Sequence, residues 1–313
     1  HHSVGEEVLD AGLHLLVEKP LGITIRAARR LIAAAKKAKR VLATAENTRR
    51  CLPSRAAAWA IRDRKIVGDM LLTNIQGIGY GPFDYSNPAF KWRGVKILTG
   101  GGLLMDSGAH FADMQMVMFG EPLEAYCTLA TYDRRTIPDA PVVGSALPDI
   151  EDTWHAVIKF KSGVQTVWTY ARQFPAGASN FGHYYGTEGT MEDLSGWRFH
   201  CFEGGGQALL PGNKVISRDQ IEKDYLLSLP GEIKERLFPY GCSHSFGIEL
   251  WDFADAVQHN RKPEIDGEDG LAAQALCMTC YESSAAGTVI KYTDVLSGKV
   301  ERYQEPINQH WKI

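Results

Sequence analysis

The sequence predicts an α/β protein in two parts: an incomplete doubly wound parallel sheet, followed by an α+β domain with a large, mainly antiparallel, open sheet. Over residues 3–46, helix and strand patterns alternate, which is typical of a parallel sheet with helices on its faces. After residue 65, longer segments alternate polar and apolar residues, which is typical of antiparallel strands with one face on a core. A chain of 313 residues is long enough for both parts.

The first part begins with an amphipathic helix that ends at Gly12. A short apolar strand at 13–17, an alanine-rich helix at 25–39 and a second strand at 41–45 follow. These elements make up about half of a doubly wound domain, because a complete one has earlier strands and a glycine-rich first turn. We therefore expect the chain to begin in mid-domain, with His1 a native residue after a lost segment rather than the remnant of a purification tag.

The second part opens with a helix at 56–65. Its strands are predicted at 70–78, 124–132, 154–160 and 164–170. Two late helices at 246–259 and 270–286 close the domain, and the second is rich in Ala and Ser, which suits close packing.

The composition argues against several classes of function. A net charge of -3 gives no general attraction for nucleic acid or for an anionic membrane surface. No apolar stretch approaches the roughly 20 residues that span a bilayer. The six cysteines are dispersed, so we expect free thiols in a reducing, cytoplasmic setting. The Cys-x-x-Cys at 277–280 lies in a predicted helix without a second pair at zinc spacing, and we predict no metal.

Two separate segments carry residues suited to proton transfer. Lys19 follows the first strand in Glu18-Lys19-Pro20, at the sheet edge where parallel sheets bind ligands, and the Lys-Pro bond is one that can be cis. The glycine triplet 100–102 precedes Asp106 and His110, whose i, i+4 spacing places both side chains on one face of a helix. Each segment alone also fits a plain loop or a surface helix. Their combination is the specific signal.

In this order and at this separation, the two segments resemble the Gfo/Idh/MocA family, the relatives of glucose-fructose oxidoreductase and inositol dehydrogenase. His1 stands where that family closes its Pro-Asn-x-x-His turn, and 266–271 resembles the start of a late helix, so the resemblance covers essentially the whole chain. It implies a Rossmann domain that binds NAD or NADP, here partial and limited to 1–54. It also implies a domain at 55–313 that presents the substrate and forms dimers or tetramers through its sheet.

The resemblance implies a catalytic group of Lys19, Asp106 and His110. Oxidation of a secondary alcohol sends a hydride to the nicotinamide and a proton to a base of the protein. Lys19 and His110 are both candidates for that base, and Asp106 would share the substrate contacts or balance the charge. Asp113 either orients the imidazole of His110 or is an ordinary capping residue.

The same resemblance assigns the binding residues. The expected cofactor contacts are His1, Glu18, Lys19, Pro20, Asn47 and Arg50. A capping loop with surface arginines is the alternative reading of Asn47 and Arg50. The expected substrate contacts are Trp92, Arg93, Asp106 and His110, because a sugar offers an apolar face and hydroxyl groups. An oligomer contact is the alternative for Trp92 and Arg93.

We predict an NAD(P)-dependent oxidoreductase that transfers a hydride between a nicotinamide cofactor and a secondary alcohol of a sugar, glycoside or cyclitol. Redox-neutral sugar chemistry, in which elimination or glycoside cleavage passes through a keto intermediate, would use the same residues. An alternative of another class is a cofactor-less sugar-binding or interaction protein, because the glycine-rich fingerprint is missing. The intact proton-transfer residues argue against that alternative, since binding alone has no need of them.

Overall fold

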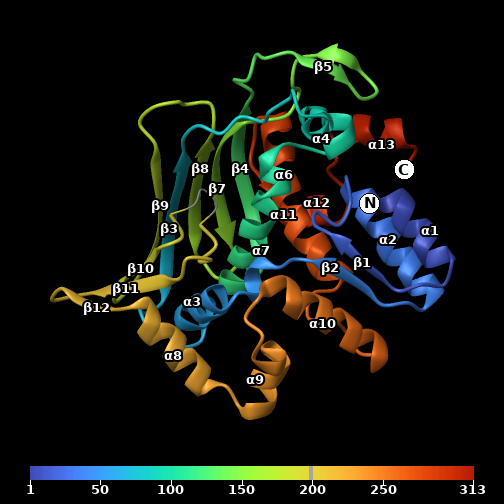
Figure 1. The fold of residues 1–313 in the computed structure, drawn as a ribbon. Coiled ribbons are helices and arrows are strands. Elements are labelled where there is room, and N and C mark those ends of the chain that lie inside the picture. Colours follow the sequence, from blue (N-terminus) through green and yellow to red (C-terminus); the bar gives the residue numbers. More distant parts are fainter. Residues whose placement is uncertain (197–199) are drawn as a thin grey trace.

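The computed structural model describes residues 1–196 and 200–313. Its first part is a two-stranded parallel sheet of β1 (Leu15–Glu18) and β2 (Leu42–Ala45), flanked by α1 (His2–Asp10) and α2 (Ile25–Ala38) (Figure 1). Helix α2 begins where the Thr24 side chain accepts a hydrogen bond from the Ala27 N–H, and it ends at Lys39 in a left-handed conformation. The predicted alternation of helix and strand is confirmed.

The second part is built on a nine-stranded sheet in which every neighbouring pair is antiparallel except β3 and β8. This arrangement confirms the predicted fold class. Across the sheet the strands are β12 (Lys214–Ile216), β11 (Gly206–Leu210), β10 (Thr190–Asp193), β9 (Ser179–Gly186), β3 (Met70–Ile78), β8 (Gln165–Ala171), β7 (Thr153–Phe160), β4 (Pro122–Ala130) and β13 (Ile290–Lys291). A separate hairpin consists of β5 (Ile137–Ala140) and β6 (Gly144–Ala146).

Helices cover one face of this sheet, and the other face is open (Figure 1). The covered face carries an aromatic core, in which Trp154 stacks on Tyr170 with ring centres 4.2 Å apart and Trp168 stacks on Phe111 at 4.0 Å. The remaining helices are α3 (Leu52–Arg62), α4 (Pro88–Lys91), α5 (Lys96–Thr99), α6 (Leu103–Asp106), α7 (Gly108–Phe119), α8 (Arg218–Ser228), α9 (Gly231–Leu237), α10 (Ser245–Gln258), α11 (Gly267–Ala286), α12 (Tyr292–Leu296) and α13 (Glu305–Trp311), with 3-10 turns at η1 (Thr48–Arg50), η2 (Trp92–Gly94) and η3 (Pro239–Gly241).

Helix α11 joins the two parts. It starts with a capping box between Asp266 and Asp269, and most of its residues are buried. The Gln274 amide accepts a hydrogen bond from the Gly22 N–H and donates one to the Gly22 carbonyl, which ties the helix to the segment after β1. A methyl group at Gly270 would collide with the Thr44 side chain of β2, so a glycine is required for this close approach.

The predicted single helix through Asp106 and His110 is wrong. Helix α6 ends at Asp106, and α7 begins two residues later at Gly108. The cause is a tightened turn, in which the His110 N–H bonds the carbonyl of Ser107, only three residues back. The two side chains therefore belong to consecutive helices and need not share a face.

Among the described residues, no helix combines the length and the apolar character needed to cross a membrane. In the same ranges, no three His, Cys, Asp or Glu side chains converge as they do around a metal ion.

Candidate active site

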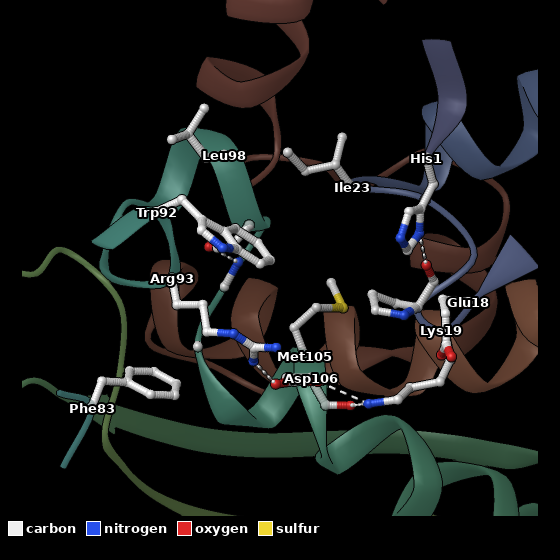
Figure 2. A pocket seen from close by; sticks show the side chains of 15 residues that line it. His1, Glu18, Lys19, Ile23, Phe83, Trp92, Arg93, Leu98, Met105 and Asp106 are labelled. Carbon is white, nitrogen blue, oxygen red and sulfur yellow. Dashed lines mark hydrogen bonds and ion pairs between the residues drawn. The ribbon is translucent and has the colours of Figure 1, made fainter. Parts of the chain in front are cut away.

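A cavity of about 530 Å³ lies between the end of β1 and the segment from α4 to α6 (Figure 2). Parallel strands bring ligands to their carboxyl ends, and β1 leads into this cavity at Glu18. The volume falls within the range of roughly 300 to 1,000 Å³ that is typical of small-molecule sites. The lining residues are His1, Glu18, Lys19, Pro20, Gly22, Ile23, Phe83, Trp92, Arg93, Leu98, Thr99, Gly101, Gly102, Met105 and Asp106.

Three charged side chains, Lys19, Asp106 and Arg93, are linked by ion pairs along one wall of the cavity (Figure 2). Lys19 Nζ lies 2.8 Å from Oδ1 of Asp106 and also donates to the Asp106 carbonyl at 2.9 Å. Arg93 Nη1 lies 2.5 Å from the other carboxylate oxygen, Oδ2. Burial alone would raise the pKa of Asp106, but the Lys19 ammonium and the Arg93 guanidinium outweigh it and hold that pKa below its ordinary value. Asp106 is therefore an ionised acceptor shared by two cations.

The backbone next to Lys19 has the isomer that the sequence allowed, because the Lys19–Pro20 peptide is cis. His1 lies close by, and its Nδ1 is 2.8 Å from the Pro20 carbonyl. The predicted cofactor residues that flank β1 therefore share one side of the cavity.

Aromatic rings surround Arg93 on the opposite side of the cavity. Its guanidinium lies 5.1 Å from the ring centre of Trp92 and 5.8 Å from that of Phe83. The indole of Trp92 is 40% exposed and is anchored by a hydrogen bond from Nε1 to the Ala89 carbonyl. A fixed, open indole beside a cation and a carboxylate is suited to a sugar ring, which has apolar faces and hydroxyl edges.

His110 has a partner that the sequence did not indicate. Its Nδ1 lies 2.5 Å from Oε1 of Glu46, the first residue after β2. Burial disfavours both charges, but their attraction lowers the pKa of Glu46 and raises that of His110. Asp113, which was one candidate to orient His110, instead lies 3.0 Å from Nε of Arg49. The described lining of the large cavity includes Lys19 and Asp106 but not His110.

The structure does not bring Asn47 and Arg50 to this cavity. Arg50 is 1% exposed, and its guanidinium bonds the carboxylates of Asp252 and Glu264. The amide nitrogen of Asn47 lies 3.3 Å from Oγ of Ser245. Both side chains bond residues of α10, and Arg50 also bonds Glu264, while neither residue is part of the described lining of the cavity.

Glu151 is a further residue that the sequence did not single out. Its buried carboxylate accepts hydrogen bonds from the backbone N–H groups of Gly102 at 2.8 Å and Leu104 at 2.9 Å, at the start of α6. Burial raises the pKa of Glu151 to about 7. A methyl group at Gly101 would collide with Tyr281, and one at Gly102 would collide with Glu151. The glycines therefore allow the loop that carries Asp106 to lie directly on these two side chains.

Comparison with known proteins gives two family matches. Residues 63–292 match the C-terminal alpha/beta domain of an oxidoreductase family, and residues 1–46 match the NAD-binding Rossmann fold of the same family. A curated relative, 1,5-anhydro-D-fructose reductase from Ensifer adhaerens, is 26% identical over 288 residues, which are 92% of this chain and 75% of the relative.

Solved structures show the same fold. The aldose-aldose oxidoreductase of Caulobacter crescentus, crystallised with glycerol, matches with a TM-score of 0.71 and 23% identity over 93% of this chain and 76% of the other. A levoglucosan dehydrogenase in complex with NADH and levoglucosan matches with a TM-score of 0.70 and 22% identity, over 93% and 77% of the two chains. Because the C-terminal family match alone spans well over half of its residues, the chain belongs to the Gfo/Idh/MocA family of oxidoreductases.

Proposed function

We propose that the protein is an NAD(P)-dependent dehydrogenase that acts on a secondary alcohol of a sugar, glycoside or cyclitol. The observation that carries the proposal is the pair of salt bridges that Asp106 forms with Lys19 and Arg93, in a cavity at the carboxyl end of β1. A cation that can exchange a proton stands there beside a fixed carboxylate and an indole. The names of the relatives support this substrate class, since they refer to an anhydro sugar, aldoses and levoglucosan.

The residues on the β1 side of the cavity fit the nicotinamide end of the cofactor. Pro20 and Ile23 offer an apolar surface for a planar ring, while His1 and Glu18 offer a ring nitrogen and a carboxylate for polar contacts. We propose His1, Glu18, Lys19 and Pro20 as the cofactor contacts of this chain. Asn47 and Arg50 are not among the proposed contacts, because neither is part of the described lining of the cavity. When bound, the nicotinamide exchanges a hydride with the substrate carbon.

The side chains of this protein handle the proton. Lys19 donates it to the carbonyl oxygen during reduction and accepts it from the hydroxyl during oxidation. Asp106 holds the Lys19 ammonium in place at 2.8 Å, and Arg93 holds the second oxygen of Asp106. Trp92 and Arg93 orient the sugar ring against this group. His110, held by Glu46, is the second group that exchanges protons at this end of the fold.

We propose that the border between the partial cofactor domain and the substrate domain lies at 54/55. We propose that two copies pair through the open face of the nine-stranded sheet, where apolar side chains from β4, β7 and β8 are exposed. The six cysteines form no disulfide with one another, which fits a reducing compartment such as the cytoplasm.

The test is a titration of the protein with NADH and NADPH, followed by nicotinamide fluorescence, and then a screen of sugars and cyclitols for NAD(P)+ reduction. We expect saturable binding of at least one cofactor and turnover of at least one polyol. Lys19→Met should lower kcat about 10²-fold or more, while saturable cofactor binding remains through His1, Glu18 and Pro20. Lys37→Met, at an exposed position of α2, serves as the matched control and should leave kcat unchanged.

Absence of binding to both cofactors would overturn the proposal and favour a sugar-binding protein without a cofactor. Full activity of the Lys19 variant would retain the dehydrogenase but remove Lys19 from its chemistry.

A further inference from the structure

A second, much smaller cavity lies behind Lys19. Its lining includes Lys19 and Pro20 from the end of β1, Glu46 from the end of β2, and Asp113 from α7. Lys19 and Pro20 also line the large cavity, so they separate the two spaces. The side chain of Lys19 therefore has the proposed substrate site on one side and a pair of buried carboxyl groups on the other.

The small cavity has the size and the polarity to hold one water molecule. The space open to a water-sized sphere is about 10 Å³, close to the minimum of roughly 10 to 15 Å³ that one water requires. A buried water also needs two to four polar partners. The lining residues that carry polar side chains are Lys19, Thr44, Glu46, Asp113 and Gln274.

Lys19 has a donor to spare for such a water. An ammonium carries three N–H groups, and the two hydrogen bonds that Lys19 makes within the described residues both go to Asp106. Asp106 cannot return a proton to Lys19, because its two cationic partners hold its pKa below the ordinary value. If Lys19 gives its proton to a substrate, another group must therefore return a proton to the amine.

Asp113 is the group best placed to return a proton to the Lys19 amine. Burial raises the pKa of Asp113 to about 7, against the opposing effect of Arg49 and with the support of Glu46 and Asp269. A carboxyl group with this pKa can hold or release a proton at neutral pH. Glu46, which also lines the small cavity, connects the same space to His110.

We infer that one water molecule binds in the small cavity and passes protons between Lys19 and the buried carboxyl groups of Asp113 and Glu46. This inference rests on the proposed function. In the reduction direction, the bound cofactor would supply the hydride for the substrate carbon, and Lys19 Nζ would give its proton to the substrate oxygen. The neutral amine then takes a proton from the water, and the water takes one from Asp113. Oxidation runs through the same positions in reverse.

This route makes Asp113 and Glu46 positioning and proton-storing residues, which act through Lys19 and do not touch the substrate. It also places the group that resupplies the proton outside the large cavity, whose described lining does not include Asp113 or Glu46.

The first measurement is a crystal structure of the wild-type protein at about 1.5 Å resolution. We expect a density peak in the small cavity within about 2.7 to 3.2 Å of both Lys19 Nζ and a carboxylate oxygen. A cavity without density at that resolution would overturn the inference, whatever the activity of the enzyme.

The second measurement uses variants. Ala273→Val adds two methyl groups at a buried position of α11 that lines the small cavity, and it should displace the water. Ala272→Val, at the preceding position outside that lining, is the matched control. We expect Ala273→Val to lower kcat about 10²-fold for reduction of the ketone that corresponds to the polyol found in the screen, with KM and the NADH dissociation constant unchanged. The control should retain the wild-type kcat.

Asp113→Asn tests the same route without filling the cavity. The groups that face Asp113 are Arg49 from η1, Glu46 after β2, His110 from α7 and Asp269 from α11. In the wild type, kcat for reduction should fall as the pH rises through about 7, because Asp113 then loses the proton that it supplies. The variant should have a low kcat without this inflection. If Ala273→Val does not fold, Asp113→Asn and the crystal structure decide.

The two proposals fail in different ways. If the wild-type protein binds no nicotinamide cofactor, the proposed function fails. If the wild type turns over while Ala273→Val and Asp113→Asn retain its kcat and its pH profile, only the water route fails.

Discussion

Asp106 is the residue at which the charges of the candidate site meet. One carboxylate oxygen faces the Lys19 ammonium and the other faces the Arg93 guanidinium. Asparagine has nearly the same shape, but it carries no charge and has a single acceptor oxygen. Replacing Asp106 therefore separates the role of its charge from the role of its volume.

We expect Asp106→Asn to lower kcat/KM about 10²-fold, because Lys19 and Arg93 are no longer held in the reactive arrangement. NADH affinity should change less than kcat/KM, since Lys19 is the only proposed cofactor contact to which the Asp106 side chain is hydrogen-bonded within the described residues. Steady-state kinetics and a fluorescence titration measure the two quantities, and Asp10→Asn on the exposed side of α1 is the control. Wild-type kinetics in the variant would remove Asp106 from the mechanism.

Arg50 illustrates a charged residue whose role is structural. Its guanidinium is almost fully buried between Asp252 and Glu264. We expect Arg50→Met to reduce the free energy of unfolding by about 1.5 to 3 kcal/mol, because Asp252 and Glu264 lose their hydrogen bonds to Arg50 but keep Arg261 and Arg55. Urea denaturation measures this change. The NADH affinity of the folded variant should be unchanged. A weaker affinity would support the sequence-based prediction that Arg50 contacts the cofactor.

The residues near β1 could be predicted, and those after β2 could not. Lys19 and Asp106 stand in short motifs whose order along the chain is itself informative. Glu46 follows its strand just as directly, yet the local sequence does not show whether Glu46, Asn47 or Arg50 points back to the sheet edge. For Arg50 that direction is set by acidic partners 202 and 214 positions away in the chain.

At the scale of elements, the loop before α6 is positioned by residues from distant parts of the chain. Glu151 precedes β7 and Tyr281 belongs to α11, yet both lie against the glycines that precede Asp106. The start of a helix leaves several N–H groups without intrahelical partners, and the Glu151 carboxylate binds two of them. The position of Asp106 thus depends on a carboxylate that never reaches the substrate cavity.

We expect Gly102→Ala to move α6, because its new methyl group would collide with Glu151. The Lys19–Asp106 contact would be lost, and kcat should fall about 10²-fold. Gly231→Ala is a matched control, since its methyl group at the start of α9 would meet no atom within 4 Å. Kinetics of both variants, with circular dichroism to verify folding, form the test. Equal activities would show that Glu151 does not fix the loop.

Long, regularly alternating elements were predictable, and their interruptions were not. The strand predicted at 70–78 has those bounds in the structure, and buried positions alternate with more exposed ones from Leu72 to Ile78. The break between α6 and α7 falls at Ser107-Gly108, a pair that is poor in a helix interior. Glu151 binds the start of α6, and Gly108 packs against Trp168, and neither contact can be read from the local sequence.

At the scale of the whole molecule, the open face of the large sheet is a continuous surface. Tyr126 of β4 lies opposite Val157 of β7, which lies opposite Val167 of β8, and Val167 in turn lies opposite Asn74 of β3. The first three side chains are each more than a third exposed. A row of this kind can pair with a second copy of itself about a twofold axis.

We expect the wild-type protein to be a dimer or a tetramer by light scattering after size exclusion. The double variant Val157→Lys/Val167→Lys places like charges on both sides of the pairing surface and should be monomeric at micromolar concentration. Leu227→Lys, at an exposed position of α8, should leave the assembly unchanged. A wild-type monomer, or a double variant that assembles normally, would show that this face does not pair.

Helix α11 gives the proposed border at 54/55 a particular meaning. By sequence the helix belongs to the second domain, but Gly270 and Gln274 are seated on the first. If the protein were cut at that border, the side of α11 that packs against β2 and against Gly22 would be exposed to water. We therefore expect both parts to melt in one transition. During evolution, the first part could be exchanged between relatives only together with compensating changes along α11.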